Sequence, residues 1–298
     1  MILIKNKMKI AIYSRNHNND EVCFISNVID YLTAKGNEVL ISANFKDHFD
    51  NITLFTTYQD LKNQPHPDFL FSFGGDGTFL DCANLVGDLD IPIVGINTGR
   101  IGFLTGINKN AFEQSFTMLE NKEYILEERA LLNLESDDHI ELLSKYALND
   151  ITLHSSDLSY VNTIKVWIND EFVNTYWADG LIIATPTGST AYSLSCGGPI
   201  IMPMVNANVI IPIASHSLSV RPIIVPADDI ITVTFESRSE NFSLTLDSIR
   251  AIVKNPVRLT ISKEKFTIKT VRFHSADFFS VIREKLMWGL DKRNISEI

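Results

Sequence analysis

One short turn, residues 74–78 (Gly-Gly-Asp-Gly-Thr), combines a flexible backbone with one carboxylate and one hydroxyl. It follows an apolar run over residues 68–73 that predicts a buried strand, and the residues after it predict a helix. Because glycine has no Cβ, the amides of the three glycines can turn toward a phosphate at the start of that helix. Asp76 would repel such an anion, so it needs another role: holding a metal ion, accepting a proton, or capping the helix. A strand-to-helix turn without further function is the alternative.

A second stretch carries four hydroxyl groups within six residues and is followed by a tyrosine. Its hydroxyl residues are Thr185, Thr187, Ser189 and Thr190, and the aromatic residue is Tyr192. Hydroxyls at this density can satisfy ribose and phosphate oxygens without adding charge, and Tyr192 offers a flat face to a purine or nicotinamide ring. The alternative is a Ser/Thr-rich loop whose side chains only form turns.

Three further places carry polar groups suited to a nucleotide. Asn149 can read a base edge or a ribose, and the neighbouring Asp150 is the usual kind of partner for a ribose diol. Residues 97–103 form a glycine-rich loop after a predicted strand, and His216 lies among serines. Each also has a simpler explanation, because Asn, Asp and Gly favour turns and a lone histidine is usually structural.

The first part of the chain alternates predicted strands and helices. Strands are predicted at residues 8–14, 38–42, 68–73 and 91–96. Between the first two, apolar residues at helical spacing predict a helix with Asn19 or Asp20 as N-cap and Gly36 just past its end. This alternation predicts a Rossmann-like, doubly wound parallel sheet, in which ligands gather at the carboxyl ends of the strands.

From about residue 129 the pattern changes to short alternating runs typical of antiparallel strands. They fall at residues 130–134, 140–150, 161–168, 172–177, 230–236, 241–247, 257–262 and 265–273. Hairpin turns are predicted at residues 169–170, 237–239 and 262–264. We therefore expect an antiparallel β-sandwich over residues 129–271 after an α/β domain over residues 1–128.

The last predicted element is a helix that Ser275 can cap. Its apolar stripe needs a surface to cover it, so we expect this helix, within residues 272–298, to return to the first domain. The stripe consists of Phe278, Phe279, Ile282 and Leu286.

Composition narrows the function classes. The 298 residues carry a formal charge of −10, which disfavours nonspecific binding to nucleic acid or to an anionic membrane. The three cysteines are widely spaced and fit a reducing cytoplasm better than a disulfide framework or a metal site. The N-terminus lacks the cleavage site of a signal peptide, and no apolar run is long enough to span a membrane.

Taken together, the motifs resemble those of the NAD kinase family, in the same order, from about residue 70 to residue 250. The stretches that carry the resemblance are residues 74–78, 98–104, 149–150, 179–180 with 185–192, and 216–219. The first motif alone also resembles that of 6-phosphofructokinases and of diacylglycerol and sphingosine kinases. The hydroxyl-rich stretch together with Asn149 and Asp150 is what favours NAD kinases.

The resemblance implies transfer of the ATP γ-phosphoryl group to the 2′-hydroxyl of the adenosine ribose of NAD, giving NADP and ADP, with a divalent metal such as Mg²⁺. Asp76 matches the catalytic aspartate of the family. The matched NAD-binding residues are Asp76, Gly77, Phe103, Asn149, Asp150, Asp179, Thr187, Thr190, Ala191, Tyr192 and Ser195, and the phosphate-binding residues are Gly74, Gly75, Gly77 and Thr78. The family often has Glu where this chain has Asp150. It also often has Asp-Gly-Gln or Asp-His at residues 247–249, so contacts from that loop stay unassigned.

Other functions remain to be distinguished. A lipid kinase would need an apolar acceptor surface or a cationic membrane-facing patch, and a sugar-phosphate kinase would need clustered basic residues. The chain shows neither pattern, since Arg100, Arg129 and Arg221 are scattered. A dinucleotide sensor without turnover is disfavoured by Asp76 but stays open. The resemblance further implies a homodimer or homotetramer, and it leaves polyphosphate open as a second donor.

Overall fold

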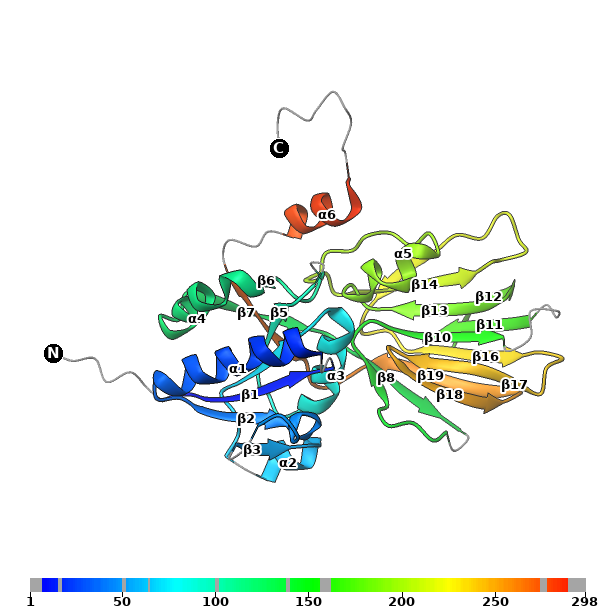
Figure 1. The fold of residues 1–298 in the computed structure, drawn as a ribbon. Coiled ribbons are helices and arrows are strands. Elements are labelled where there is room, and N and C mark those ends of the chain that lie inside the picture. The colour runs from blue at the N-terminus through cyan, green and yellow to red at the C-terminus, as the bar shows by residue number, and fades with distance from the viewer. Residues whose placement is uncertain are drawn as a thin grey trace. The chain divides into compact units, whose positions relative to one another are not determined.

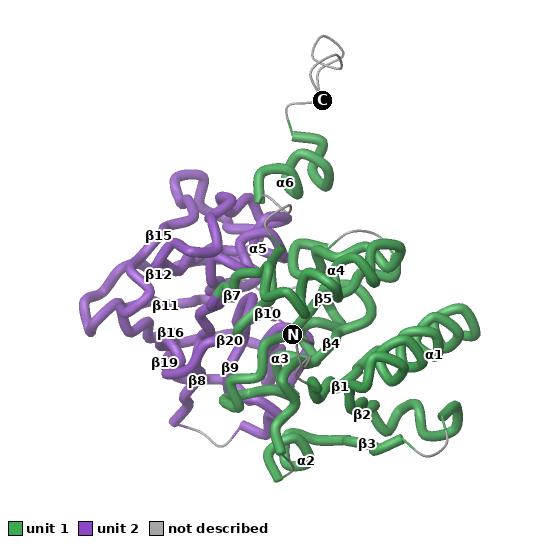
Figure 2. Tube along the Cα trace, turned by 90° about the vertical axis from the view of Figure 1, so that its left-hand side faces the viewer, with its two compact units in different colours: residues 1–127, 268–298 green, residues 128–267 purple. Residues whose placement is uncertain are grey.

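The computed structural model describes residues 7–15, 18–49, 52–63, 65–99, 102–137, 140–155, 162–273 and 278–288. The chain divides into two compact units (Figure 2). Unit 1 comprises residues 1–127 and 268–298, and unit 2 comprises residues 128–267. Among the described residues, no helix is long and apolar enough to cross a membrane.

Unit 1 is built on an eight-stranded sheet whose main path runs β3-β2-β1-β4-β5-β20-β7, with β6 paired to β5. Its strands are β1 (Lys9–Ser14), β2 (Glu38–Ser42), β3 (Thr53–Phe55), β4 (Phe69–Phe73), β5 (Ile93–Asn97), β6 (Ile107–Asn108), β7 (Tyr124–Arg129, which ends just past the unit boundary) and β20 (Ile268–Phe273). Its helices are α1 (Asn19–Ala34), α2 (Tyr58–Asn63), α3 (Asp76–Val86), α4 (Phe112–Glu120) and α6 (Phe278–Leu286), with short 3-10 turns at Ala43–Phe45 and Lys109–Ala111. The pairs β3-β2, β2-β1, β1-β4, β4-β5, β5-β6 and β5-β20 are parallel, as predicted for a doubly wound sheet.

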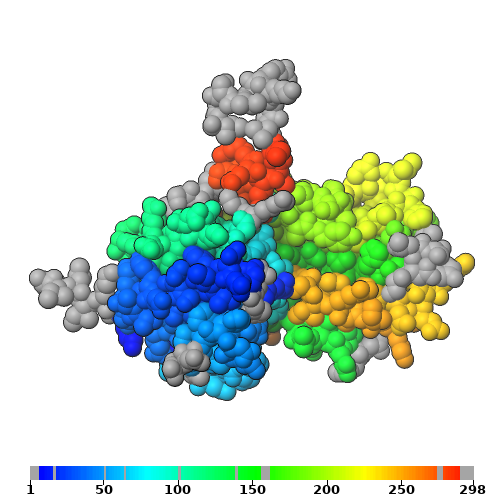
Figure 3. All heavy atoms as spheres, viewed as in Figure 1, coloured from blue at the N-terminus to red at the C-terminus, as the bar shows by residue number. Residues whose placement is uncertain are grey.

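Helix α1 shows how the sequence determines these elements. Its apolar stripe is buried at Ile25, Val28, Ile29 and Leu32, and the helix lies on the surface of unit 1 (Figures 1 and 3). The predicted N-cap was wrong by one or two residues, because Asn18 caps the helix: its side chain accepts the Glu21 amide at 2.8 Å. Gly36 follows the helix with φ of +83°, as expected for a helix end.

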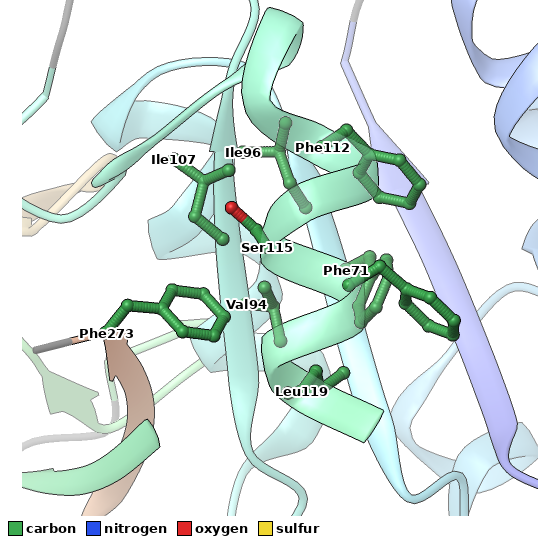
Figure 4. Close-up of a pocket in the computed structure, with 9 residues that line it drawn as sticks. Phe71, Val94, Ile96, Ile107, Phe112, Ser115, Leu119 and Phe273 are labelled. Carbon is green, nitrogen blue, oxygen red and sulfur yellow. The ribbon is translucent and has the colours of Figure 1, made fainter. Parts of the chain in front are cut away.

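Aromatic side chains fill the core beneath α4. Phe71 on β4 packs against both Phe112 and Phe116 of α4, with ring centroids 6.1 and 6.4 Å away. Figure 4 shows a small pocket here, lined almost entirely by carbon, with Phe273 of β20 on one side and Ser115 of α4 on another. Its apolar lining makes it part of the core packing.

Unit 2 consists of two six-stranded sheets. One has the order β15-β14-β13-β10-β17-β18, and the other has the order β12-β11-β16-β19-β8-β9. The strands are β8 (Leu132–Ser136), β9 (Tyr146–Ala147), β10 (Asp150–Ser155), β11 (Asn162–Ile168), β12 (Glu171–Ala178), β13 (Gly180–Ala184), β14 (Ala207–Ile213), β15 (Ile223–Pro226), β16 (Ile231–Glu236), β17 (Asn241–Leu246), β18 (Ile249–Lys254) and β19 (Val257–Lys263). A 3-10 turn (Gly188–Thr190) and the short helix α5 (Tyr192–Ser195) complete the unit.

The two sheets of unit 2 share one apolar core, as expected for a β-sandwich. Phe235 of one sheet stacks on Phe242 of the other with ring centroids 4.6 Å apart. The predicted turn at residues 169–170 joins β11 and β12, and both Asn169 and Asp170 have positive φ, as a tight hairpin requires.

Three strand predictions need correction. The turn at residues 262–264 does not form a hairpin, because β20 pairs in parallel with β5 in unit 1. The run at residues 140–150 is not one strand: it contains only β9 and the first residue of β10. The run at residues 241–247 ends at Leu246, because Asp247 has φ of +52°. The proposed cap Ser275 lies outside the described residues.

Candidate active site

The glycine turn of unit 1 leads from β4 into α3. Gly74 has φ of +148°, and a Cβ added there would lie 2.3 Å from Oγ1 of Thr78, so only glycine fits. Its amide donates to the Ile96 carbonyl at 2.9 Å and is therefore not available to a phosphate. The amides of Gly75, Asp76 and Gly77 begin α3 and have no hydrogen-bond partner within the described part of the chain. Free amides at the start of a helix are able to bind an anion.

The Asp76 carboxylate is held by a second loop. One of its oxygens accepts the Phe103 amide at 2.9 Å, and the other accepts the Leu104 amide at 3.0 Å. The helix is capped instead by Gly75, which excludes the capping role for Asp76. A Cβ added at Gly102 would lie 1.8 Å from Oδ1 of Asp76, so the loop approaches the carboxylate closely only because residue 102 is glycine.

A cation from the C-terminal helix lies beside this carboxylate. Nζ of Lys285 on α6 is 3.9 Å from Oδ2 of Asp76 and 4.5 Å from the ring centroid of Phe103. The Asp76 side chain is nevertheless 32% exposed, so solvent or a substrate can reach it. Unit 1 therefore combines an accessible carboxylate with a nearby ammonium and free helix amides.

The loop after β5 is fastened internally. The Asn97 side chain accepts the Gly99 amide at 2.7 Å and donates to the Thr105 hydroxyl at 3.2 Å. These bonds fix the two ends of the loop that presents Phe103 and Leu104 to Asp76. Two members of the predicted loop motif, Arg100 and Ile101, lie outside the described residues.

In unit 2, a different aspartate fastens the Asn149 and Asp150 segment. The carboxylate of Asp247 accepts the amides of Leu148, Asn149 and Asp150 at 2.7, 2.7 and 3.1 Å. These bonds lie where β9 ends and β10 begins, so they mark the break between the two strands. In the loop at residues 247–249, whose contacts the sequence left unassigned, Asp247 therefore holds the backbone of residues 148–150.

Three hydroxyl groups of the hydroxyl-rich stretch donate hydrogen bonds to backbone carbonyls of unit 2. Thr185 donates to the Leu148 carbonyl at 2.6 Å, Ser189 to the Pro186 carbonyl at 2.7 Å, and Thr190 to the Thr187 carbonyl at 3.3 Å. These three hydroxyls fold the segment. Thr185 and Ser189 are buried, and their oxygens already accept the amides of Gly188 and Ile201 at 3.1 and 3.0 Å. Of the three, the half-buried Thr190 keeps an oxygen that can accept a hydrogen bond from a ligand.

Backbone packing joins this stretch to Asn149. The Thr185 amide donates to the Asn149 carbonyl at 2.9 Å, and a Cβ added at Gly188 would lie only 2.0 Å from that same oxygen. Thr187 is buried, while Thr190 and Ala191 are half-buried. The structure thus brings Asn149 together with the hydroxyl-rich stretch in one cluster.

The remaining predicted site residues of unit 2 differ in exposure. Asp150 is buried and accepts the Thr152 hydroxyl at 2.9 Å. Burial, together with the neighbouring charge of Asp247, raises the pKa of Asp150 to about 7. Burial likewise raises the pKa of Asp247 to about 6 against the lowering effect of its three amides. Tyr192 is 43% exposed, Ser195 is exposed and Asp179 is half-buried.

The last predicted residue, His216, is held by its backbone. It is exposed, and the hydrogen bond that fixes it runs from its backbone amide to the Trp177 carbonyl at 2.8 Å. This bond does not involve the imidazole, so the structural role expected of a lone histidine stays a prediction.

Family models match both units of the chain. The model described as ATP-NAD kinase N-terminal domain matches residues 16–124, and that described as ATP-NAD kinase C-terminal domain matches residues 148–273. The chain belongs to the NAD kinase family.

Full-length relatives agree with this assignment. The NAD kinase of Cytophaga hutchinsonii is 41% identical over 292 residues, covering 96% of this chain and all of the relative. The NAD kinase of Bacteroides fragilis is 41% identical over 289 residues with the same coverage.

Two solved structures are similar in fold. Yeast NADH kinase complexed with NADH has a TM-score of 0.85 at 25% identity, covering 96% of this chain and 89% of that one. An NAD kinase from Archaeoglobus fulgidus in complex with ATP has a TM-score of 0.73 at 25% identity, covering 94% and 99%.

For a member of this family, the residues in unit 1 fit a Mg²⁺ ion that arrives with its nucleotide. The described residues contain no group of three His, Cys, Asp or Glu side chains that could hold an ion alone. Mg²⁺ commonly needs only one or two carboxylates when phosphates supply further ligands. Asp76 provides one carboxylate beside the free amides of α3.

Sequence reasoning did not identify two groups that the structure brings to this turn. Arg15 and Asp81 pair with each other, and a Cβ added at Gly77 would lie 2.9 Å from Nη1 of Arg15. The signal for Arg15 was its position directly after the first predicted strand. No local signal linked it to Asp81, which is 66 residues away.

Proposed function

We propose that this protein is an NAD kinase, a phosphotransferase that uses an alcohol acceptor. It transfers the ATP γ-phosphoryl group to the 2′-hydroxyl of the adenosine ribose of NAD and releases NADP and ADP. Family membership over both units and the two full-length relatives named NAD kinase support this activity. The Archaeoglobus structure with ATP supports ATP as the donor.

The observation that carries the proposal is the Asp76 carboxylate, fixed by two amides yet still one-third exposed. Phosphoryl transfer needs an oriented acceptor and charge neutralisation more than covalent catalysis. Oδ1 of Asp76 accepts the Leu104 amide and, at 3.5 Å, the Thr105 hydroxyl. Oδ2 accepts the Phe103 amide and keeps a lone pair for the acceptor hydroxyl. Asp76 accepts the proton of the 2′-hydroxyl as that oxygen attacks the γ-phosphorus.

The donor triphosphate binds at the glycine turn. The amides of Gly75, Asp76 and Gly77 donate to its oxygens at the positive end of α3, while Gly74 and Thr78 shape the turn. A Mg²⁺ ion bound with the triphosphate would offset its negative charge, with Asp76 as its protein ligand.

Phe103 in unit 1 and several residues of unit 2 are each proposed to contact NAD. Asn149 and Asp150 hold the nicotinamide-side ribose, and Tyr192 offers its exposed ring to a base. The other proposed contacts are Asp179, Thr187, Thr190, Ala191 and Ser195. The hydroxyl hydrogen of Thr190 is donated to the Thr187 carbonyl, so its oxygen can accept a hydroxyl hydrogen of a ribose.

Further properties follow from family membership as proposals. The enzyme works in the cytoplasm as a homodimer or homotetramer. Its α/β nucleotide-binding domain spans residues 1–128 and is completed by residues 272–298, and its NAD-binding domain spans residues 129–271. Polyphosphate is a candidate second donor, to be tested beside ATP.

Incubation with ATP, Mg²⁺ and NAD, followed by a dehydrogenase assay specific for NADP, tests the activity directly. We expect NADP in the wild-type reaction and none without ATP. NADH belongs in a parallel reaction, because the yeast relative is an NADH kinase. Intact NAD binding without any NADP would contradict the proposal and favour a dinucleotide sensor.

A further inference from the structure

Arg15 lies where the sheet of unit 1 reverses its strand order. It follows the last residue of β1, and β1 pairs in parallel with β4 so that Ser14 is opposite Phe73. The strands on either side of this pair follow in order of sequence: β2 and then β3 lie beyond β1, and β5 lies beyond β4. In open parallel sheets, ligands bind outside the carboxyl ends of the strands at such a switch point. Arg15 and the glycine turn therefore leave neighbouring strands at the same edge.

A carboxylate on α3 fixes the guanidinium. Nε and Nη2 of Arg15 donate to the two oxygens of Asp81, one helical turn beyond Gly77. The Tyr13 hydroxyl donates to Oδ2 of the same aspartate at 2.9 Å. A bidentate ion pair of this kind fixes the plane of the guanidinium as well as its position.

The remaining nitrogen of Arg15 faces the glycine turn. Nη1 would be 2.9 Å from a Cβ at Gly77, so it lies against the first turn of α3, where the amides of Gly75, Asp76 and Gly77 are free. The Arg15 side chain is 42% exposed, whereas that of Asp81 is 23% exposed. The pair therefore presents its cation to solvent at the anion-binding end of the helix.

We propose that Arg15 binds the donor triphosphate through Nη1 and thereby positions the γ-phosphoryl group for transfer. The proposal rests on the proposed kinase function. It adds a charged donor to a turn that otherwise offers only backbone amides, and phosphate oxygens are preferred partners of arginine. Asp81 and Tyr13 act through Arg15 as positioning residues.

Arg15→Gln tests the role of the charge, and Lys269→Gln is the matched control. Lys269 is likewise paired with an aspartate, Asp90, but near the start of β20, at the opposite edge of the same sheet. We expect Arg15→Gln to lower kcat/KM for ATP by about 10- to 100-fold, the effect of losing a hydrogen bond to a charged group. KM for NAD should change less than twofold, and the control should match the wild type.

Binding measurements separate this role from a purely structural one. Calorimetry with adenosine 5′-(β,γ-imido)triphosphate and with adenosine should show that Arg15→Gln weakens only the triphosphate. Arg15→Lys should recover part of the loss, and Asp81→Asn should show a smaller loss because Arg15 keeps its charge but not its anchor.

An unchanged KM for ATP in a folded Arg15→Gln protein, or equal weakening of adenosine and the triphosphate analogue, would overturn the role of Arg15. Wild-type protein that makes no NADP would instead overturn the kinase proposal, and the binding measurements would still decide on Arg15. If Arg15→Gln does not fold, Arg15→Lys and Asp81→Asn carry the same test.

Discussion

Two aspartates, one in each unit, fasten a distant loop by accepting consecutive backbone amides. Asp76 holds the amides of Phe103 and Leu104, and Asp247 holds those of Leu148, Asn149 and Asp150. Both therefore shape a segment that carries predicted substrate-binding residues. The sequence distance spanned is 27 or 28 residues for Asp76 and 97 to 99 residues for Asp247.

The groups around the two carboxylates differ in the sign of their charge. Asp76 lies at the positive end of α3 with the Lys285 ammonium 3.9 Å away. Asp247 lies beside a second carboxyl group, Asp150, and its own lone pairs are taken by three amides. The same bonding pattern thus serves two purposes: Asp76 is available for chemistry, whereas Asp247 maintains the backbone around Asn149.

The largest effect should come from Asp76→Asn. We expect kcat for NADP formation to fall by about 10²- to 10⁴-fold, the range for loss of a general base, while NAD still binds. Asp90→Asn, at the opposite edge of the sheet, is the control and should keep wild-type turnover. Ordinary turnover in Asp76→Asn would remove the distinction between the two aspartates.

Asp247→Ala should reduce stability more than any substitution at Asp76. It leaves three amides without their acceptor, which predicts a loss of about 2–4 kcal/mol in the free energy of unfolding. Urea unfolding measures this, with Ser248→Ala on the adjacent exposed residue as control. A loss no larger than that of the control would mean that Asp247 does not hold the segment.

Gly102→Ala should affect Asp76 without removing it. The new methyl group would overlap Oδ1 of Asp76, so either the carboxylate or the loop must move. We expect kcat to fall by about tenfold, since small misplacements of a reacting group are costly. Gly106→Ala meets no atom within 4 Å and should behave as the wild type. Equal activity in the two variants would show that the position of Asp76 is not critical.

The last prediction concerns the pH dependence of stability and Asp150. Its pKa is raised to about 7 in the folded protein, so the folded state binds protons more tightly than the unfolded chain. Stability should therefore fall as pH rises from about 4 to 7. Asp150→Asn should flatten part of this decline in Tm, with the remainder arising from Asp247, whereas Asp170→Asn in the exposed hairpin turn should not. An unchanged slope in Asp150→Asn would contradict the burial of this carboxyl group.

Local patterns predicted much of the fold. The strand and helix alternation of unit 1 and the positive φ values at Asn169 and Asp170 follow from residue types that act over a few positions. The pairing of β20 could not be predicted in this way. Its alternating residues suit either sheet, and only the partner β5, about 175 positions earlier, decides.

The candidate site shows the same limit. The glycine turn was visible in the sequence because its residues are contiguous. The clamp of Asp247 on Leu148 and the pair of Arg15 with Asp81 depend on contacts between residues 99 and 66 positions apart. The hydroxyl-rich stretch was recognised, but the internal use of its hydroxyl hydrogens depends on backbone geometry that composition does not reveal.

An experimental structure with NAD and a non-hydrolysable ATP analogue tests the central claim most directly. The measurement is the distance from the carboxylate of Asp76 to the hydroxyl oxygens of the adenosine ribose. The account predicts that the 2′-oxygen lies within about 2.6–3.2 Å of a carboxylate oxygen of Asp76. Another hydroxyl group at that distance, or no ribose oxygen near Asp76, would contradict it.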